Sequence, residues 1–337
     1  MKGAIFAYSR QGCQTARRIR SQLTGEVLCY TMERFQEPGF SPIDKKRYGE
    51  LFAWADTMIF VGACGIAVRE IAPFVRDKRT DPAVICIDEL GRFVIPLLSG
   101  HIGGANDLAQ ALAQALGAVP VITTATDIHG RFSVDSWAVN HGCAIGSMPL
   151  AKAVSAAVLE GEVPFYSQFP ISGQLPRGLT LGQEGPLGIA VTLGSHQPFE
   201  RTLQLIPRIV HLGIGCRKGT SAKTIENVVA ETMASHGLDI RCVKSVASID
   251  LKAQEPGLLE VCRNHGWPVE FYTPEELKAL SGPFTPSDFV SQVTGVDNVC
   301  ERAACMKGQQ LIVKKTARCG VTVGAAAEHW EVSFWEK

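Results

Sequence analysis

The densest group of reactive side chains lies between Ser99 and Asp107, in the segment SGHIGGAND. It holds His101 and, further along, the amide of Asn106 beside the carboxylate of Asp107. A histidine titrates near neutral pH, so it can take a proton from water and later return it. His101 is therefore the first candidate for an acid–base residue, with Glu70 and Asp107 as second candidates.

Glycines surround these side chains, at Gly100, Gly103 and Gly104. A glycine lets a ligand approach the backbone, and the helix predicted over residues 108–116 would direct free N–H groups at the turn. Such a turn suits a carboxylate or a phosphate. The same glycines could instead only form a tight strand-to-helix connection, and the turn by itself leaves both interpretations open.

Two other predicted strands, residues 57–61 and 120–122, also lead into segments of small or polar residues. In an open parallel sheet the carboxyl ends of the strands share one edge, and ligands bind in the crevice outside it. We therefore predict that all three segments meet at one binding site. The residues expected to contact a ligand there are Gly62, Cys64, Gly65, Arg69, Ser99, Gly100, Gly103, Gly104, Asn106, Thr123, Thr124 and Asp127.

Two features of the chain after the strand predicted at residues 57–61 have more than one interpretation. Cys64 precedes a predicted helix, whose N-terminus would stabilise a thiolate, so it could act as a nucleophile. A small buried cysteine without a chemical role is the more common situation. The basic residues Arg69, Arg76, Lys78 and Arg79 suit either a solvated loop or an anionic ligand.

A second anion-binding turn is predicted where the strand at residues 209–212 ends. The glycines that follow match neither the dinucleotide fingerprint nor the P-loop, which disfavours a nucleotide. Ser221 or Thr220 could also cap the helix predicted over residues 222–236 and have no ligand. The candidate substrate-binding residues in this turn are Gly215, Arg217, Lys218, Thr220 and Ser221.

The order of the elements predicts an α/β fold with three parts. Residues 1–141 alternate strands and helices, with a hairpin between the runs at 83–88 and 92–97, which predicts a layered, largely parallel sheet with flanking helices. Residues 142–206 are rich in turns and predict a small bridging subdomain. Residues 207–337 begin a fresh pattern and predict a separate C-terminal α/β domain.

Charge and cysteine content exclude several classes of protein. The chain has 337 residues with 33 Lys plus Arg and 33 Asp plus Glu, so no general positive field favours nucleic acid or an anionic membrane. No apolar run approaches the ~20 residues of a membrane span, and residues 1–8 suit a strand better than a signal peptide, so we expect a cytoplasmic protein. The 11 cysteines lack a Cys-x-x-Cys pair, so we expect reduced thiols and no protein-bound metal.

The segments GACGIAVR (62–69), SGHIGGAND (99–107) and TTATD (123–127) occur in an order and spacing that resemble the cobalt-precorrin-5A hydrolase family of anaerobic cobalamin biosynthesis. The resemblance continues through residues 132–135 and from residue 212 to the C-terminus. It implies a hydrolase that opens the δ-lactone on ring A of cobalt-precorrin-5A and releases acetaldehyde, giving cobalt-precorrin-5B. It also implies that the substrate carries the cobalt, so no cofactor is expected.

The resemblance also implies the partners of the protein. The substrate is a cobalt-bound tetrapyrrole with several carboxylates, so Arg69 and the pair Arg217 and Lys218 are predicted to bind those carboxylates from two domains. The chain could form a homo-oligomer or contact other enzymes of the pathway. Two rival functions stay open, a non-catalytic tetrapyrrole carrier or scaffold and a nucleotide-dependent α/β enzyme.

Overall fold

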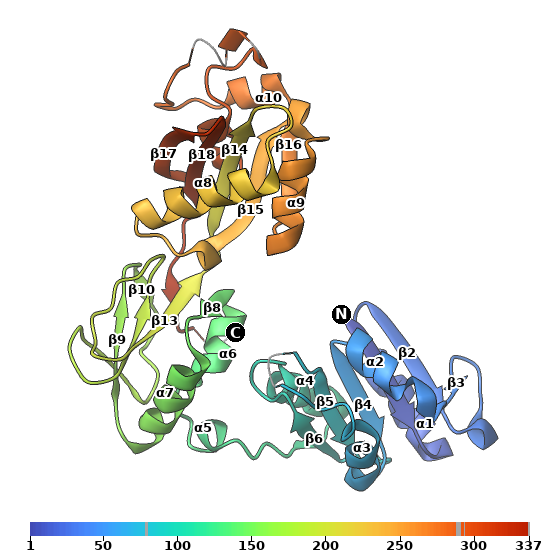
Figure 1. Cartoon of the computed structure of the whole chain (residues 1–337). Coiled ribbons are helices and arrows are strands. Elements are labelled where there is room, and N and C mark those ends of the chain that lie inside the picture. The colour runs from blue at the N-terminus through green and yellow to red at the C-terminus, as the bar shows by residue number, and fades with distance from the viewer. Residues whose placement is uncertain (78–79, 288–290, 293, 336–337) are drawn as a thin grey trace. The chain divides into compact units, whose positions relative to one another are not determined.

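The computed structural model describes residues 1–77, 80–287, 291–292 and 294–335 (Figure 1). They form two compact units, Met1–Trp137 and Ala138–Lys337. Both units combine helices with sheets that contain parallel strands, and the N-terminal sheet is largely parallel, which confirms the predicted α/β class. The second unit contains both a middle and a C-terminal sheet, and the division into three domains after residues 141 and 206 stays a prediction.

The first unit is built around a mixed sheet with the strand order β3-β2-β1-β4-β5-β6-β7. Its strands are β1 (Lys2–Ala7), β2 (Glu26–Thr31), β3 (Ser41–Pro42), β4 (Thr57–Val61), β5 (Ala83–Ile87), β6 (Phe93–Leu98) and β7 (Val119–Pro120). Its helices are α1 (Arg10–Arg20), η1 (Glu33–Phe35), η2 (Lys45–Arg47), α2 (Tyr48–Trp54), α3 (Cys64–Ile71), α4 (Ala105–Leu116) and α5 (Ala125–Ile128). The chain passes into the second unit within α6 (Val134–Asn140).

Helices cover both faces of this sheet. α1 and α4 pack on the face that contains Ile5, and α2 and α3 pack on the face that contains Phe6. Successive residues of a strand point to opposite faces, so a strand buried on both faces must be apolar throughout. This explains β4, whose residues are buried along its whole length.

The hairpin between β5 and β6 reverses the strand direction within the sheet. The strands β1 to β5 run parallel, β6 pairs antiparallel with β5, and β7 pairs parallel with β6. Leu98, at the end of β6, therefore lies beside Val84, near the start of β5. The prediction that three strand ends meet at one site is wrong, because the segment after β4 starts at the edge opposite to the segments after β6 and β7.

The second unit begins with a middle sheet of order β11-β9-β12-β13-β8, on which α7 (Met148–Glu160) packs. Its strands are β8 (Cys143–Ile145), β9 (Val163–Ser167), β11 (Leu179–Leu181), β12 (Gly188–Val191) and β13 (Thr202–Pro207). The strands predicted near residues 163 and 189 are confirmed as β9 and β12. A short parallel pair joins β10 (Ile171–Ser172) to β19 (Val332–Ser333), so the end of the chain returns to this sheet's neighbourhood.

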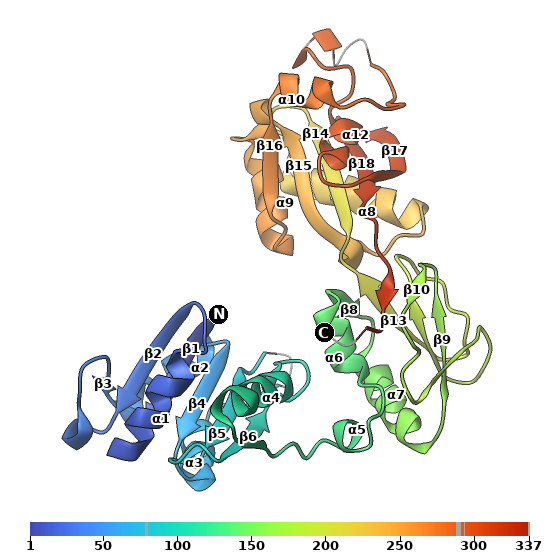
Figure 2. The same ribbon diagram turned by 180° about the vertical axis from the view of Figure 1, so that it is seen from behind.

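The C-terminal sheet has the order β16-β15-β14-β18-β17. Its strands are β14 (Val210–Cys216), β15 (Val243–Ile249), β16 (Val269–Tyr272), β17 (Gln310–Arg318) and β18 (Val321–Ala327). The helices around it are α8 (Ala222–Ser235), η3 (Ile240–Cys242), η4 (Asp250–Lys252), α9 (Pro256–His265), α10 (Pro274–Ala279) and α12 (Cys300–Cys305). α8 and α9 cover one face, and α12 lies on the other face, seen from behind in Figure 2.

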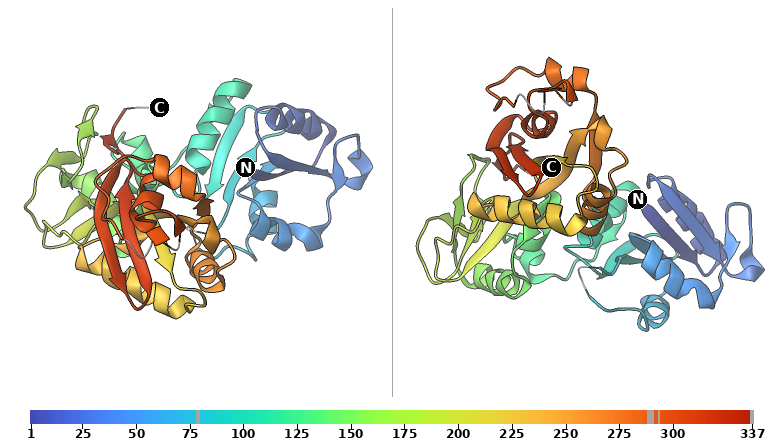
Figure 3. Two further views of the ribbon diagram at one scale, coloured as in Figure 1. Left: turned by 90° about the horizontal axis from the view of Figure 1, so that it is seen from above. Right: turned by 45° about the horizontal axis from the view of Figure 1, so that its top comes forward.

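The hairpin of β17 and β18 forms one edge of this sheet (Figure 3). Its turn residues, Cys319 and Gly320, have φ angles of 49° and 75°. Positive φ at both central residues is what a two-residue turn between twisted antiparallel strands requires. Within the described residues, no helix combines the length and the apolar character needed to cross a membrane.

Candidate functional site

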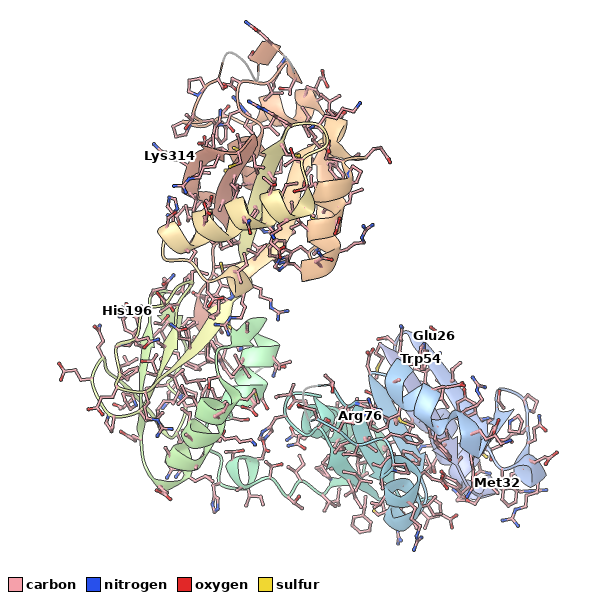
Figure 4. The ribbon with its side chains drawn as sticks, viewed as in Figure 1. Glu26, Met32, Trp54, Arg76, His196 and Lys314 are labelled. Atoms are coloured by element: carbon pink, nitrogen blue, oxygen red, sulfur yellow. The ribbon has the colours of Figure 1, made fainter. Side chains whose placement is uncertain are left out.

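Ser99 begins the turn that follows β6, at the sheet edge where β6 and β7 end. Ser99 has a φ of 56°, which is uncommon for a residue with a side chain. Its buried hydroxyl donates to the carbonyl of Asp81 at 3.0 Å, and the Asp81 carboxylate accepts the N–H groups of Arg76 (labelled in Figure 4) and Asp77 at 2.8 and 3.0 Å. The loop before β5 thus holds the start of the turn, and the Ser99 hydroxyl is occupied by a structural hydrogen bond.

The folded structure itself requires glycine at three positions of this turn. A Cβ on Gly100 would lie 2.7 Å from the side-chain oxygen of Asn106, and a Cβ on Gly103 would collide with the side chain of Ser99. Gly104 has a φ of 76° at the N-cap position of α4. Packing and backbone conformation therefore account for all three, and close approach of a ligand to them stays a prediction.

A hydrogen-bonded group of side chains, the His101 cluster, occupies this edge and consists of His101, Asn106, Thr124, Thr126 and Asp127. His101 Nε2 lies 3.0 Å from Asp127 Oδ2 and 3.5 Å from the Thr126 hydroxyl. The Asn106 amide donates to Asp127 at 3.0 Å and to the Thr124 hydroxyl at 3.1 Å. The turn after β6 and the segment after β7 therefore meet, as two of the three predicted junctions should.

The electrostatics of the cluster favour an acid–base role for His101. The hydrogen bond from His101 lowers the pKa of the Asp127 carboxyl, with burial opposing and the Asn106 amide assisting, so this carboxyl is ionised at neutral pH. An ionised Asp127 keeps a proton on Nε2 of His101, which leaves Nδ1 as the basic nitrogen. The side chains of His101 and Asp127 are 18% and 29% exposed, so a ligand can reach them.

The other acid–base candidates, and Thr123, lie outside the cluster. Asp107 is exposed in the first turn of α4, and Thr123 is exposed just before α5. Glu70 is in α3 and forms an ion pair with Lys45 at 3.3 Å, with 17% of its side chain exposed. Among the acid–base candidates, therefore, His101 alone belongs to the hydrogen-bonded cluster of described residues.

The residues after β4 form a separate surface at the other edge. Gly62 packs under the ring of Tyr8, and Cys64 is half-buried at the first position of α3. Arg69 is exposed and donates to the carbonyl of Gly65 in its own helix, at 3.4 Å. Two other members of the predicted basic cluster, Lys78 and Arg79, lie outside the described residues.

In the second unit, a cavity of about 590 Å³ opens where β14 and β15 end, against the β17–β18 hairpin. We name it the cationic cavity, because five basic side chains line it and its described lining contains no carboxylate. These side chains are Arg217, Lys218, Lys252, Lys315 and Arg318. Gly215, also predicted to bind the substrate, lines the same cavity.

Family models of known proteins match the segments that contain the His101 cluster and the cationic cavity. The family model described as "Cobalamin synthesis G N-terminal" matches residues 46–127, which include the whole His101 cluster. The model described as "Cobalamin synthesis G C-terminus" matches residues 210–326, which include every basic residue of the cationic cavity.

Full-length relatives decide the family. The cobalt-precorrin-5A hydrolase of Salmonella typhimurium is 34% identical over 97% of both chains. The cobalt-precorrin-5A hydrolase of Priestia megaterium is 32% identical over 95% of this chain and 94% of its own. The chain belongs to the cobalt-precorrin-5A hydrolase family. A solved structure, a putative cobalamin biosynthesis protein G homolog from Sulfolobus solfataricus, aligns over 97% of both chains with 21% identity and a TM-score of 0.42.

In this family member the turn after β14 is held by contacts within the protein. Glu255 accepts the N–H of Gly219 at 2.6 Å, and the Thr220 hydroxyl donates to the carbonyl of Arg217 at 2.8 Å. Ser221 caps α8 by accepting the N–H of Thr224 at 3.2 Å. Neither hydroxyl lines the cavity, so within this turn the two basic side chains and Gly215 carry the binding surface.

Cysteines also line the cationic cavity of this family member. Burial raises the pKa of the Cys216 thiol and raises that of Cys300 to about 12, so neither is a thiolate nucleophile at neutral pH. All 11 cysteines are free. Over the described part of the chain, no group of three His, Cys, Asp or Glu residues is arranged to hold a metal ion.

Several residues of the His101 cluster and of the cationic cavity are not predicted from the sequence. Thr126 lies in the segment TTATD, where the predicted ligand contacts are Thr123, Thr124 and Asp127. Lys252, Lys315 and Arg318 come from a short 3₁₀ turn and an edge strand, where basic residues are usually solvated. They lie in no recognisable motif, so the sequence gives no signal that they bind a ligand.

Proposed function

We propose that this protein hydrolyses cobalt-precorrin-5A, opening the δ-lactone on ring A and releasing acetaldehyde to leave cobalt-precorrin-5B. The observation that carries the proposal is the 34% identity over 97% of both chains to a protein named for this reaction. The partly exposed pair of His101 and Asp127 supplies acid–base groups that the reaction needs.

The chemistry has two parts, and each moves protons. In the first, water loses a proton as it attacks the acyl carbon, and the ring oxygen of the lactone takes a proton as it leaves. In the second, the new alcohol loses its proton, the carbon–carbon bond breaks, and acetaldehyde departs. The electron pair of that bond stays on the ring carbon, which is then protonated. A single group that takes and returns protons can serve both parts.

His101 suits this work because its two ring nitrogens have different surroundings. Nε2 is held by Asp127, whereas Nδ1 has no hydrogen-bond partner among the described residues. Nδ1 can take the proton of the attacking water, and the ionised Asp127 then stabilises the imidazolium. Asn106 is buried, with 3% exposed, and donates to Asp127, so it holds the carboxylate in place without reaching the substrate.

The test is turnover by the purified full-length chain. Incubation with cobalt-precorrin-5A should give a product whose mass is that of the substrate plus one water minus one acetaldehyde, and a carbonyl-trapping reagent should collect the acetaldehyde. Tight binding of the substrate with no acetaldehyde would support a carrier and contradict the hydrolase. The absence of a resident metal, a cytoplasmic location and self-association stay predictions.

A further inference from the structure

We propose that the cationic cavity binds carboxylate side chains along one edge of a tetrapyrrole, and that Glu301 is a positioning residue that aims Lys315 into this site. The inference rests on the proposed function for the identity of the ligand. It adds three basic residues, Lys252, Lys315 and Arg318, and one buried acid to the turn that the sequence indicated.

The charges of the cavity are only partly balanced by the protein. Lys252 pairs with Glu255 at 3.4 Å, and Arg318 pairs with Glu231 at 3.0 Å.

Three further basic side chains, those of Arg217, Lys218 and Lys315, line the same cavity and have no ion-pair partner among the described residues. Like charges gathered around one cavity repel each other, and an anionic ligand would remove that repulsion. Several separate cations around an open space match a ligand with several carboxylates better than a single small anion.

The cavity also offers apolar surface. Ile249, Leu251 and Val299 line it together with the basic side chains. Its volume of about 590 Å³ falls within the ~300–1,000 Å³ of common ligand sites. A tetrapyrrole presents apolar pyrrole rings that carry carboxylate side chains, so one edge of the macrocycle matches both parts of the lining.

The strand β17 contains an irregularity at the residue that contributes to this site. Val313 pairs with Ala325 and Thr316 pairs with Val323, so β17 uses one residue more than β18 over this interval. The extra residue makes a β-bulge, which turns a side chain away from the regular alternation of the strand. Lys315 lies in this interval.

Glu301 holds the bulge from the neighbouring helix. It is completely buried, and its carboxylate accepts the N–H of Lys315 at 2.6 Å. The same carboxylate accepts the N–H and the hydroxyl of Thr285 at 2.7 and 2.8 Å. A buried carboxylate is costly unless it is fully hydrogen-bonded, so these bonds determine the backbone position at Lys315.

Lys314 provides a matched control for Lys315. The two lysines are neighbours on β17, but Lys314 is exposed and does not line the cavity, and Figure 4 labels it on this edge strand. Changing either to alanine removes the same charge from the same strand. Only the change at Lys315 removes a cation from the proposed site.

The experiment titrates the full-length chain with uroporphyrin, a tetrapyrrole whose side chains all end in carboxylates, and follows protein fluorescence. Loss of one charge-assisted bond should weaken the Kd of the Lys315→Ala variant about tenfold, while the Lys314→Ala variant stays within about twofold of wild type. Equal effects of the two changes, or no effect of either, would overturn the proposal.

A double-mutant cycle tests the role of Glu301. The Glu301→Gln change should weaken uroporphyrin binding in the wild-type background and have no further effect when Lys315 is already alanine. A purely structural role would lower the melting temperature and weaken binding equally in both backgrounds, which would contradict the positioning role. If Glu301→Gln does not fold, the two lysine variants still decide whether the cavity binds the ligand.

Failure of this proposal is distinguishable from failure of the proposed function. Uroporphyrin binding needs no turnover, so the lysine variants report on the cavity even if cobalt-precorrin-5A is not converted. Conversely, conversion of cobalt-precorrin-5A with an unchanged KM in the Lys315→Ala variant would preserve the hydrolase and remove the cavity from its substrate site.

Discussion

His101 is the residue on which the proposed chemistry depends most. Changing His101 to alanine should lower turnover of cobalt-precorrin-5A by about 10²–10⁴-fold, the usual cost of losing a general acid–base group. His129, an exposed histidine that ends α5, is the matched control, and His129→Ala should leave turnover within about threefold of wild type. Steady-state kinetics and melting curves of both variants separate catalysis from folding. Near-normal turnover with early melting of His101→Ala would contradict the acid–base role.

Asp127 should make the stability of the protein depend on pH. Its pKa in the folded chain lies below the ordinary value of 3.8, because His101 donates to its carboxylate. A lowered folded pKa stabilises the fold above the unfolded pKa, and this stabilisation disappears as the pH falls through the folded pKa. The difference in unfolding free energy between wild type and Asp127→Asn, measured in urea, should therefore be largest at pH 5 or above and shrink toward pH 3. A difference that stays constant over this range would show that the carboxylate is not preferentially ionised in the folded state.

At the scale of elements, the contact between β14 and α12 is close enough to require glycine. A Cβ on Gly213 would collide with the carbonyl of Cys300 and the backbone of Ala304. Gly213→Ala should therefore lower stability by about 1–3 kcal/mol, the usual cost of overpacking. Gly161 is the control, because a Cβ there would meet no atom within 4 Å and its φ is that of extended backbone. Equal melting temperatures of the two alanine variants would show that α12 can move away from β14 without a loss of stability.

At the scale of the whole molecule, the middle and C-terminal sheets share a core. Leu193 and Ile206 belong to the same buried cluster as Leu212 and Val246. A fragment of residues 130–337, which keeps α6 whole, should therefore unfold in one transition. A fragment of residues 207–337 should melt at a lower temperature, since exposing such side chains costs about 1.5–3 kcal/mol each. Equal melting temperatures would instead support the predicted domain boundary after residue 206.

The local elements and the reactive turn can be predicted from the sequence alone. β4 occupies the predicted residues, and β5 and β6 form the predicted hairpin, because apolar runs and turn residues act over a few positions. His101 can be identified as a candidate for the same reason, since its chemistry and its glycine-rich surroundings are visible in one short segment. The pairing of Ser221 with the start of α8 also follows from local capping.

Which of these segments meet follows from the tertiary fold and not from the sequence pattern. The hairpin reverses β6, so the turn that holds His101 joins the segment after β7 and lies opposite to the start of the segment after β4. The backbone at Lys315 lies in a bulge, and its N–H is bonded to Glu301, a residue of another element. Strand direction and side-chain direction are set by pairing between distant segments, and the periodicity of a single segment contains no information about its partner.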